Sequence, residues 1–248
     1  RGEKWKATEL VEMVRNLQPG VIIDNRLGGS MEIANPEPYA GDFEGPEQYI
    51  PVRPILDIYE NPIPWEVCMT LNNHWGYCAS DMNYKSSKDV IRALVNCVSK
   101  GGNLLLNVGP DAYGNIPRPS VDILREVGAW MKLNGESIYG SGRSEFEKPD
   151  WGRYTQKGSF LYAHIFEQNI GQFCLENLMG RVKSATLLRD GSEVICSGFW
   201  NGDDKPYVRP DDLFISLGKP KPHTFMLPDQ INTVLKIAME KPSVRRGK

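Results

Sequence analysis

The chain has 248 residues, of which 24% are charged, and a formal net charge of −2 at pH 7. This length allows a sizeable core in one large domain or two ordinary ones. It carries no basic field, no polybasic run beyond a short C-terminal cluster and no apolar stretch of membrane-spanning length, so we expect no nucleic-acid partner and no membrane partner.

The cysteine and histidine patterns bear on the redox compartment and on metals. The five cysteines are scattered and lie mostly within apolar runs, which favours free thiols in a reducing, cytoplasmic compartment over a disulfide framework. The chain begins at Arg1 without a signal peptide and is interpreted as partial, so a secreted or periplasmic location stays open. No cysteine pair has metal-site spacing and the histidines are far apart, so we expect no metal site.

The first half of the chain alternates between helical and strand patterns. Three segments carry apolar residues at helical spacing: 3–17, 86–100 and 117–133. Three short apolar runs predict buried strands: 21–24, 65–71 and 103–108. Continuously apolar strands separated by helices are typical of a parallel sheet covered on both faces, and polar residues follow each strand, as at the working end of a (β/α) barrel.

A proline-rich segment, residues 42–77, follows the first predicted strand and includes the second. It combines six carboxylates with two tryptophans and three tyrosines, and its five prolines exclude regular helix over most of its length. Such a loop is poor core material and good material for a polar, ring-stacking site. Each acid taken alone is better interpreted as a solvated loop residue. The acids occur together with aromatic residues, however, and this combination favours a functional site for the cluster as a whole.

The second half of the chain changes character from Gly140 onward. Short apolar runs alternate there with glycine-rich turns: 160–166, 172–176, 182–188, 193–196, 213–217 and 233–238. This spacing predicts an antiparallel β-sandwich. We therefore expect two domains, residues 1–142 as an α/β domain and residues 143–248 as a β-sandwich with a short basic tail, Arg245, Arg246 and Lys248.

Five runs of the chain resemble the α-L-fucosidases, a family of retaining exo-glycosidases. They are VIIDNR (21–26), GDFEGPEQYIP (41–51), PWEVCMTLNNHWGY (64–77), KGGNLLLNVGPDAYGNIP (100–117) and GESIYGS (135–141). The resemblance implies that residues 1–142 are the C-terminal part of a distorted (β/α) barrel followed by the β-sandwich. It also implies retaining hydrolysis of terminal α-L-fucose from fucosylated glycans, without cofactor, by two carboxylates about 5 Å apart.

The resemblance assigns Glu47, in the GPEQ run, as the general acid/base. A Glu above an apolar, aromatic-lined pocket can hold a proton near neutral pH. Glu44, three residues earlier, is the competing candidate and is expected to lie in solvent. Arg26 matches an Arg of the family's sugar site, and the alternative is an ion pair with a loop acid such as Asp42.

Two further residues are expected at the sugar. Trp75 matches an aromatic that the family packs against fucose, the alternative being a core Trp, and the loop-like flanking residues favour the sugar site. Glu66 is expected near the substrate as a partner of Arg26.

The family's nucleophile is an Asp in a W-x-D-type run on a strand that precedes the first helix of this chain. No such run occurs here, so we expect the nucleophile upstream of Arg1. Without it the chain is expected to bind sugar and not turn it over, which leaves a sugar-binding or pseudoenzyme module as the alternative. A metal-dependent barrel hydrolase is disfavoured by the missing metal-ligand spacing. The sequence carries no signal for the linkage, the aglycone or the oligomeric state.

Overall fold

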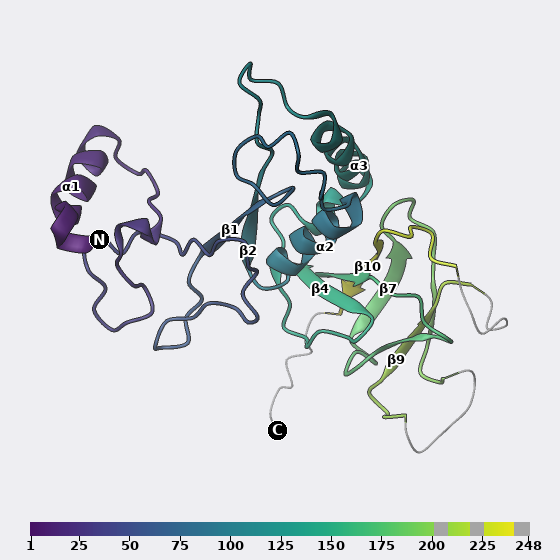
Figure 1. Cartoon of the computed structure of the whole chain (residues 1–248). Helices are drawn as coiled ribbons and strands as arrows, with labels where there is room; N and C mark the ends of the chain where they lie inside the picture. The colour runs from purple at the N-terminus through teal and green to yellow at the C-terminus, as the bar shows by residue number, and fades with distance from the viewer. Residues whose placement is uncertain (201–207, 219–225, 241–248) are drawn as a thin grey trace, which may run out of the picture. The chain divides into compact units, whose positions relative to one another are not determined.

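The computed structural model describes residues 1–200, 208–218 and 226–240 (Figure 1). The chain forms two compact units, residues 1–85 with 100–121, and residues 86–99 with 122–248. The domain boundary expected between residues 142 and 143 stays a prediction. The predicted basic tail, Arg245, Arg246 and Lys248, lies outside the described residues.

The helix predicted over 3–17 is in fact two short helices. The 3-10 turn η1 (Gly2–Trp5) precedes α1 (Ala7–Leu17), and Lys6 between them is left-handed, with φ 53°. The side chain of Glu3 explains the break, because its carboxylate accepts hydrogen bonds from the backbone N–H and the hydroxyl of Thr8. This bond satisfies one of the free donors at the start of α1, so the regular helix begins at Ala7.

Residues 21–24 are not the buried strand that was predicted. A single parallel bridge joins Asp24 to Phe43, and Ile22 is 72% exposed. The backbone N–H of Ile23 donates to the side-chain carboxylate of Asp42, at 2.8 Å, in place of a strand carbonyl. Arg15 holds the same carboxylate through two bonds of 2.9 Å. A side chain thus takes the place of a ladder partner, and no regular strand forms.

Two parallel strands form the centre of the first unit. β1 (Trp65–Thr70) and β2 (Gly102–Asn107) run side by side, with Trp65 opposite Gly102 (Figure 1). The strands predicted at 65–71 and 103–108 are therefore confirmed to within one residue, although β2 is less buried than predicted, since Leu105 is 54% exposed. Residues 43–48 line the other edge of β1 through isolated parallel bridges and do not form a regular strand. These segments alone do not form a barrel.

Two loops of the first unit, DIYEN at 57–61 and DAYGN at 111–115, fold into the same turn. In each, the Asp carboxylate accepts the N–H of the Tyr two residues later and both the N–H and the side-chain amide of the Asn four residues later. The distances are 2.8 to 2.9 Å around Asp57 and 2.9 to 3.1 Å around Asp111. These bonds close each loop on itself and lower the pKa of both carboxyl groups.

The backbone conformation at the fourth residue of each turn predicts that one substitution will stabilise the folded chain. The backbone is left-handed in both turns, with φ 64° at Glu60 and 82° at Gly114. We expect Glu60→Gly to raise the free energy of unfolding by about 0.5 kcal/mol, because glycine adopts this conformation without steric strain. Urea unfolding measures the change. Gly114→Ala is the mirror variant and should destabilise; a stabilising Gly114→Ala would contradict the explanation.

Two helices belong wholly or mainly to the second unit. α2 (Ser87–Val98) lies within the predicted helical segment 86–100 and begins at a capping box formed by Ser86 and Asp89. α3 (Arg118–Asn134) is followed by the 3-10 turn η3 (Gly135–Ser137). Ile91 and Val95 of α2 and Trp130 of α3 share one buried cluster with residues of the neighbouring sheet. The apolar stripes read from the sequence are thus the faces that these helices bury.

The rest of the second unit consists of two antiparallel sheets. The larger follows the order β3 (Gly142–Arg143), β4 (Gly152–Lys157), β5 (Phe160–Ile165), β10 (Thr233–Met239) and β7 (Val182–Leu187). The smaller follows the order β6 (Phe173–Leu175), β9 (Leu213–Ser216) and β8 (Ile195–Ser197). Every apolar run predicted after Gly140 overlaps one of these strands, and β3 and β4 were missed. The antiparallel β-rich domain is confirmed.

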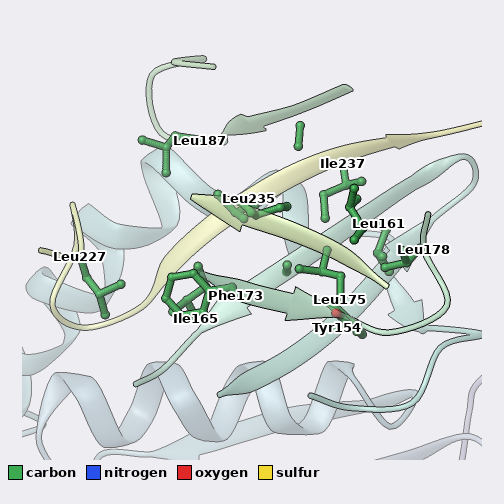
Figure 2. Packing of buried hydrophobic residues seen from close by; sticks show 14 residues of the cluster. Tyr154, Leu161, Ile165, Phe173, Leu175, Leu178, Leu187, Leu227, Leu235 and Ile237 are labelled. Atoms are coloured by element: carbon green, nitrogen blue, oxygen red, sulfur yellow. The ribbon is translucent and has the colours of Figure 1, made fainter. Parts of the chain in front are cut away.

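Both sheets contribute to one apolar core. Figure 2 shows Leu161 and Ile237 of the larger sheet in the same cluster of buried side chains as Phe173 and Leu175 of the smaller sheet. Each of these side chains is at most 1% exposed. Burial of apolar surface between the two sheets is therefore the main stabilising contribution in this part of the chain.

His164 of β5 is a fully buried histidine inside the second unit. The Asn232 amide lies 3.0 Å from its Nδ1, and its Nε2 lies 3.0 Å from the Thr155 hydroxyl, which itself donates to the Ser137 carbonyl oxygen at 2.7 Å. This arrangement fits a neutral ring that accepts at Nδ1 and donates from Nε2–H. Burial lowers the pKa of His164 from 6.5 to about 3.

The buried ring predicts a pH-dependent stability. Because the pKa is lower in the folded state, the unfolded chain binds one more proton below pH 6.5. The free energy of unfolding should fall as the pH drops from 6.5 towards 3, by up to about 1.4 kcal/mol per pH unit. Urea unfolding between about pH 7.5 and 5.5 measures this slope. A His164→Gln variant cannot titrate there, and an unchanged slope in that variant would contradict the assignment.

The structure bears on two predictions, that the cysteines are free thiols and that no segment spans a membrane. All five cysteines are free thiols, as predicted. Across residues 1–200, 208–218 and 226–240, no helix combines the length and apolar character needed to cross a membrane.

Candidate functional site

The turn after residue 23 places three consecutive polar side chains at the candidate site. Asp24 caps the short 3-10 helix η2 (Asn25–Leu27) by accepting the Arg26 N–H at 3.1 Å. Asn25 Nδ2 donates to the Glu44 carboxylate, and Asn25 Oδ1 accepts the Gly45 N–H at 3.1 Å. Asn25 therefore ties the segment that leads to Glu47 to the turn that carries Arg26.

The structure brings Arg26 and Glu47 together. Arg26 Nη1 donates to Glu47 Oε2 at 2.7 Å, and Arg26 Nη2 donates to the Gly45 carbonyl at 2.9 Å and to Cys68 Sγ at 3.3 Å. The hydrogen bond to Glu47 raises the pKa of Arg26, and burial opposes this rise. Both side chains stay partly open to solvent, at 40% and 45% exposure. The pair is thus oriented by fixed neighbours and still accessible to a ligand.

The backbone beside Glu47 is pinned to β1. The backbone N–H of Gln48 donates to the Cys68 carbonyl at 2.8 Å, and the Gln48 side chain exchanges hydrogen bonds with Thr70. Gln48 adopts φ 63°, a left-handed conformation that is rare outside glycine. Strained backbone of this kind persists only where its surroundings enforce it, and it concentrates at functional sites.

Glu44 does not lie in solvent, and that expectation was wrong. Its carboxylate is half-buried and accepts hydrogen bonds from the Asn25 amide and from the Met31 N–H, the latter at 3.4 Å. Burial raises the pKa of Glu44 above its usual value, while these two bonds oppose the rise. Glu44 forms an isolated parallel β-bridge with Trp65, whereas Glu47 forms one with Cys68, further along β1.

The remaining predicted residues lie along β1 and in the loop that follows it. Trp75 is 40% exposed, which excludes a core position, whereas Trp65 is 1% exposed and packs in the core. Glu66 is half-buried on β1 and is not among the partners of Arg26. Asp42, the alternative partner of Arg26, is bound by Arg15.

The loop after β1 is braced by a contact between His74 and Asp81 and borders a cavity. His74 Nδ1 lies 2.7 Å from Asp81 Oδ2, and this contact raises the pKa of His74 and lowers that of Asp81. Residues 77–84 and 111–119, the loops after β1 and β2, line a cavity of about 360 Å³. The cavity is located at the carboxyl ends of the two parallel strands, the end at which ligands bind in such sheets.

Two residues that the sequence analysis did not single out take part in the site. Cys68 contacts Arg26 from β1, and Asn25 fixes the Glu44–Gly45 segment. Asn25 sits inside the VIIDNR run between Asp24 and Arg26, so its position was a usable signal. Nothing in the sequence distinguishes Cys68 from an ordinary strand cysteine.

The comparisons with known proteins agree with these features. The family model described as alpha-L-fucosidase matches residues 1–136. A curated alpha-L-fucosidase of Dictyostelium discoideum is 32% identical over 194 residues, which cover 74% of this chain and 40% of that protein. Alpha-L-fucosidase isoenzyme 1 of Paenibacillus thiaminolyticus is 55% identical with a TM-score of 0.90, over 97% of this chain and 55% of that one.

A third relative carries a mechanistic detail. An alpha-L-fucosidase of Bacteroides thetaiotaomicron, described as a trapped covalent intermediate of a Glu-to-Gln mutant with 2-fluoro-fucosyl fluoride, is 26% identical with a TM-score of 0.74, over 96% of this chain and 53% of that one. The chain thus spans between two fifths and about half the length of these relatives. On the family match over residues 1–136, the chain belongs to the α-L-fucosidase family.

Proposed function

We propose that the whole protein hydrolyses terminal α-L-fucose from fucosylated glycans, with retention and without a cofactor or metal. The observation that carries the proposal is the Arg26–Glu47 pair, held at 2.7 Å at the edge of β1 within the residues that match the family. The covalent intermediate described for the Bacteroides relative supports a two-step, retaining reaction. We assign no nucleophile to any residue of this chain.

Glu47 is the proposed general acid/base. Its Oε2 binds Arg26, and its Oε1 has no hydrogen-bond partner among the described residues, so Oε1 is the atom proposed to carry the proton to the glycosidic oxygen. The same oxygen then takes a proton from the attacking water in the second step. Arg26 orients the carboxylate throughout and attracts its charged form after the proton has left.

Trp75 and Glu66 complete the proposed sugar site. Trp75 offers an exposed indole face for the apolar side of the fucose ring, and Glu66 offers a half-buried carboxylate for its hydroxyls. The nearby cavity at the ends of β1 and β2 has room for part of an aglycone. At the level of the fold, we propose that residues 1–142 form the C-terminal part of a (β/α) barrel and residues 143–248 a β-sandwich. The free thiols support a cytoplasmic location.

A chimera tests the proposed function. The N-terminal part of the Paenibacillus relative, up to the segment that matches Arg1, is fused to residues 1–248, and hydrolysis of an aryl α-L-fucoside is measured. We expect turnover by the chimera and none by the chain alone, because one carboxylate cannot complete the double displacement. A folded chimera that binds fucose without hydrolysing the fucoside would favour the sugar-binding alternative. Turnover by the chain alone would place the nucleophile inside it, with Asp24 as the first candidate.

A further inference from the structure

The second unit contains a cavity that the proposed reaction does not use. It measures about 430 Å³, within the range of small-ligand sites, and it is enclosed by the segment between β3 and β4, by β4 itself and by the end of β6 with the turn that follows. Three aromatic side chains take part in its lining: Phe146, Trp151 and Tyr154.

Its aromatic wall is rigid. The indole N–H of Trp151 donates to the Cys174 carbonyl at 3.1 Å, and the ring meets Tyr154 and Phe173 edge-on, with centroids 5.8 and 5.4 Å away. Arg181 lies 4.5 Å above the ring of Phe146 and pairs with Glu145 at 3.1 Å. These contacts fix the wall before any ligand arrives, which lowers the entropy cost of binding.

The wall contains a polar group without a partner. Tyr154 is 5% exposed, and within the described part of the chain its hydroxyl makes no hydrogen bond. Burial raises the pKa of Tyr154, and the neighbouring Cys174 and Glu176, which also line the cavity, contribute to the rise. The phenol therefore stays protonated as a neutral donor. A buried donor left unpaired is costly, which makes it a position where a ligand acceptor is strongly favoured.

The rim supplies polar groups of a different kind. Glu147, Asp150, Glu176 and Asn177 are exposed around the opening. Together with Glu145, the lining has four carboxylates against the two cations of Lys148 and Arg181, so its net charge is negative. Exposed carboxylates in water attract a cation only weakly. They do accept hydrogen bonds from hydroxyl groups, and a negative lining disfavours anionic ligands.

We propose that this cavity is a saccharide-binding site that takes a neutral sugar, with the apolar face of the ring against the aromatic wall. The Tyr154 hydroxyl donates to a ring substituent, and the rim carboxylates and Asn177 bond the outer hydroxyls. The Tyr154 hydroxyl is covered in the free chain, so binding includes a side-chain displacement at the cavity wall that opens it to the ligand. The site lies in the second unit and does not depend on the catalytic assignment.

Titration of the full chain with lactose, followed by calorimetry or ligand-observed NMR, tests the proposal. Tyr154→Phe removes only the hydroxyl and should weaken lactose binding by about 3- to 10-fold, the value of one hydrogen bond. Thermal unfolding of this variant should be unchanged or shifted upward, because an unpaired buried hydroxyl is lost. Asp150→Asn, at the exposed rim, leaves the fold untouched and should also weaken binding.

Tyr162→Phe is the matched control. Tyr162 is a buried tyrosine on the adjacent strand, and its hydroxyl donates to Glu136 at 2.7 Å, away from the cavity lining. It should lose stability and bind lactose as the unaltered chain does. The proposal is overturned if the unaltered chain binds no lactose, if Tyr154→Phe binds it undiminished, or if 1,5-diaminopentane or sialyllactose binds where lactose does not.

Discussion

In the chimera, Glu47→Gln should lower hydrolysis of natural fucosylated glycans by about 10²- to 10⁴-fold, the usual contribution of general acid catalysis. Natural glycans have poor leaving groups and depend on the proton that Glu47 is proposed to deliver. A nitrophenyl fucoside needs little protonation, so its first step should suffer less. The second step of the reaction still lacks a general base, so the covalent intermediate should accumulate. A burst of released nitrophenol in a stopped-flow assay measures this accumulation.

Azide identifies which carboxylate was removed. It needs no deprotonation, so it should restore turnover of the nitrophenyl fucoside by Glu47→Gln and give the α-L-fucosyl azide, through inversion of the β-linked intermediate. Recovery of the β-azide would mean that Glu47 is the nucleophile and would end the acid/base assignment.

Two neighbouring acids serve as controls for Glu47. Glu60→Gln changes an exposed acid of the same loop and should leave activity unaltered. Glu44→Gln leaves one carbonyl oxygen where the Asn25 amide and the Met31 N–H need two acceptors, so it should lower stability without azide rescue. Azide rescue in Glu44→Gln, with Glu47→Gln near the unaltered activity, would move the acid/base three residues upstream.

Gly152→Ala should reduce the free energy of unfolding of the second unit by more than about 3 kcal/mol. A Cβ at Gly152 would lie 1.8 Å from the His164 carbonyl oxygen on the paired strand β5. His164 cannot move away, because its ring is bonded to Thr155 and Asn232 inside the core. Urea unfolding followed by tryptophan fluorescence measures the loss.

Gly142→Ala is the matched control in the same sheet. Gly142 lies on β3, its backbone is not left-handed, and its Cβ would meet nothing within 4 Å. Its stability should change by less than about 0.5 kcal/mol. Equal losses in the two variants would contradict the contact with His164 as the cause of the loss, because the backbone-entropy effect of a Gly-to-Ala change is stabilising.

The sequence predicted most of the helices and strands that are held in place by apolar side chains alone. The helix capped by Ser86 and the strand at Trp65 were read correctly because their apolar spacing matches their buried faces. β4, with the sequence GRYTQK, was missed because its buried Thr155 is stabilised by hydrogen bonds to Ser137 and His164, which no hydrophobic pattern reveals.

The candidate site was predicted less completely, since its contacts join distant polar residues. Arg26 and Glu47 were each singled out from the sequence, which also offered Asp42 as an alternative ion-pair partner of Arg26. Only the fold shows that Asp42 is paired with Arg15 and that Arg26 is paired with Glu47. The same cause removed the strand expected at 21–24, because the Asp42 carboxylate takes the Ile23 N–H. Long-range side-chain hydrogen bonds have no period along the chain, so pattern reading does not find them.

The two turns at 57–61 and 111–115 have a consequence for engineering. Each is closed by its own Asp and Asn side chains, so its shape depends on five residues and not on the strands around it. Such a unit is transferable: the sequence D-x-Y-G-N could be grafted as a rigid loop tip in another scaffold. Its tyrosine, 67% exposed in one copy and 90% in the other, would then be presented to solvent in a defined orientation.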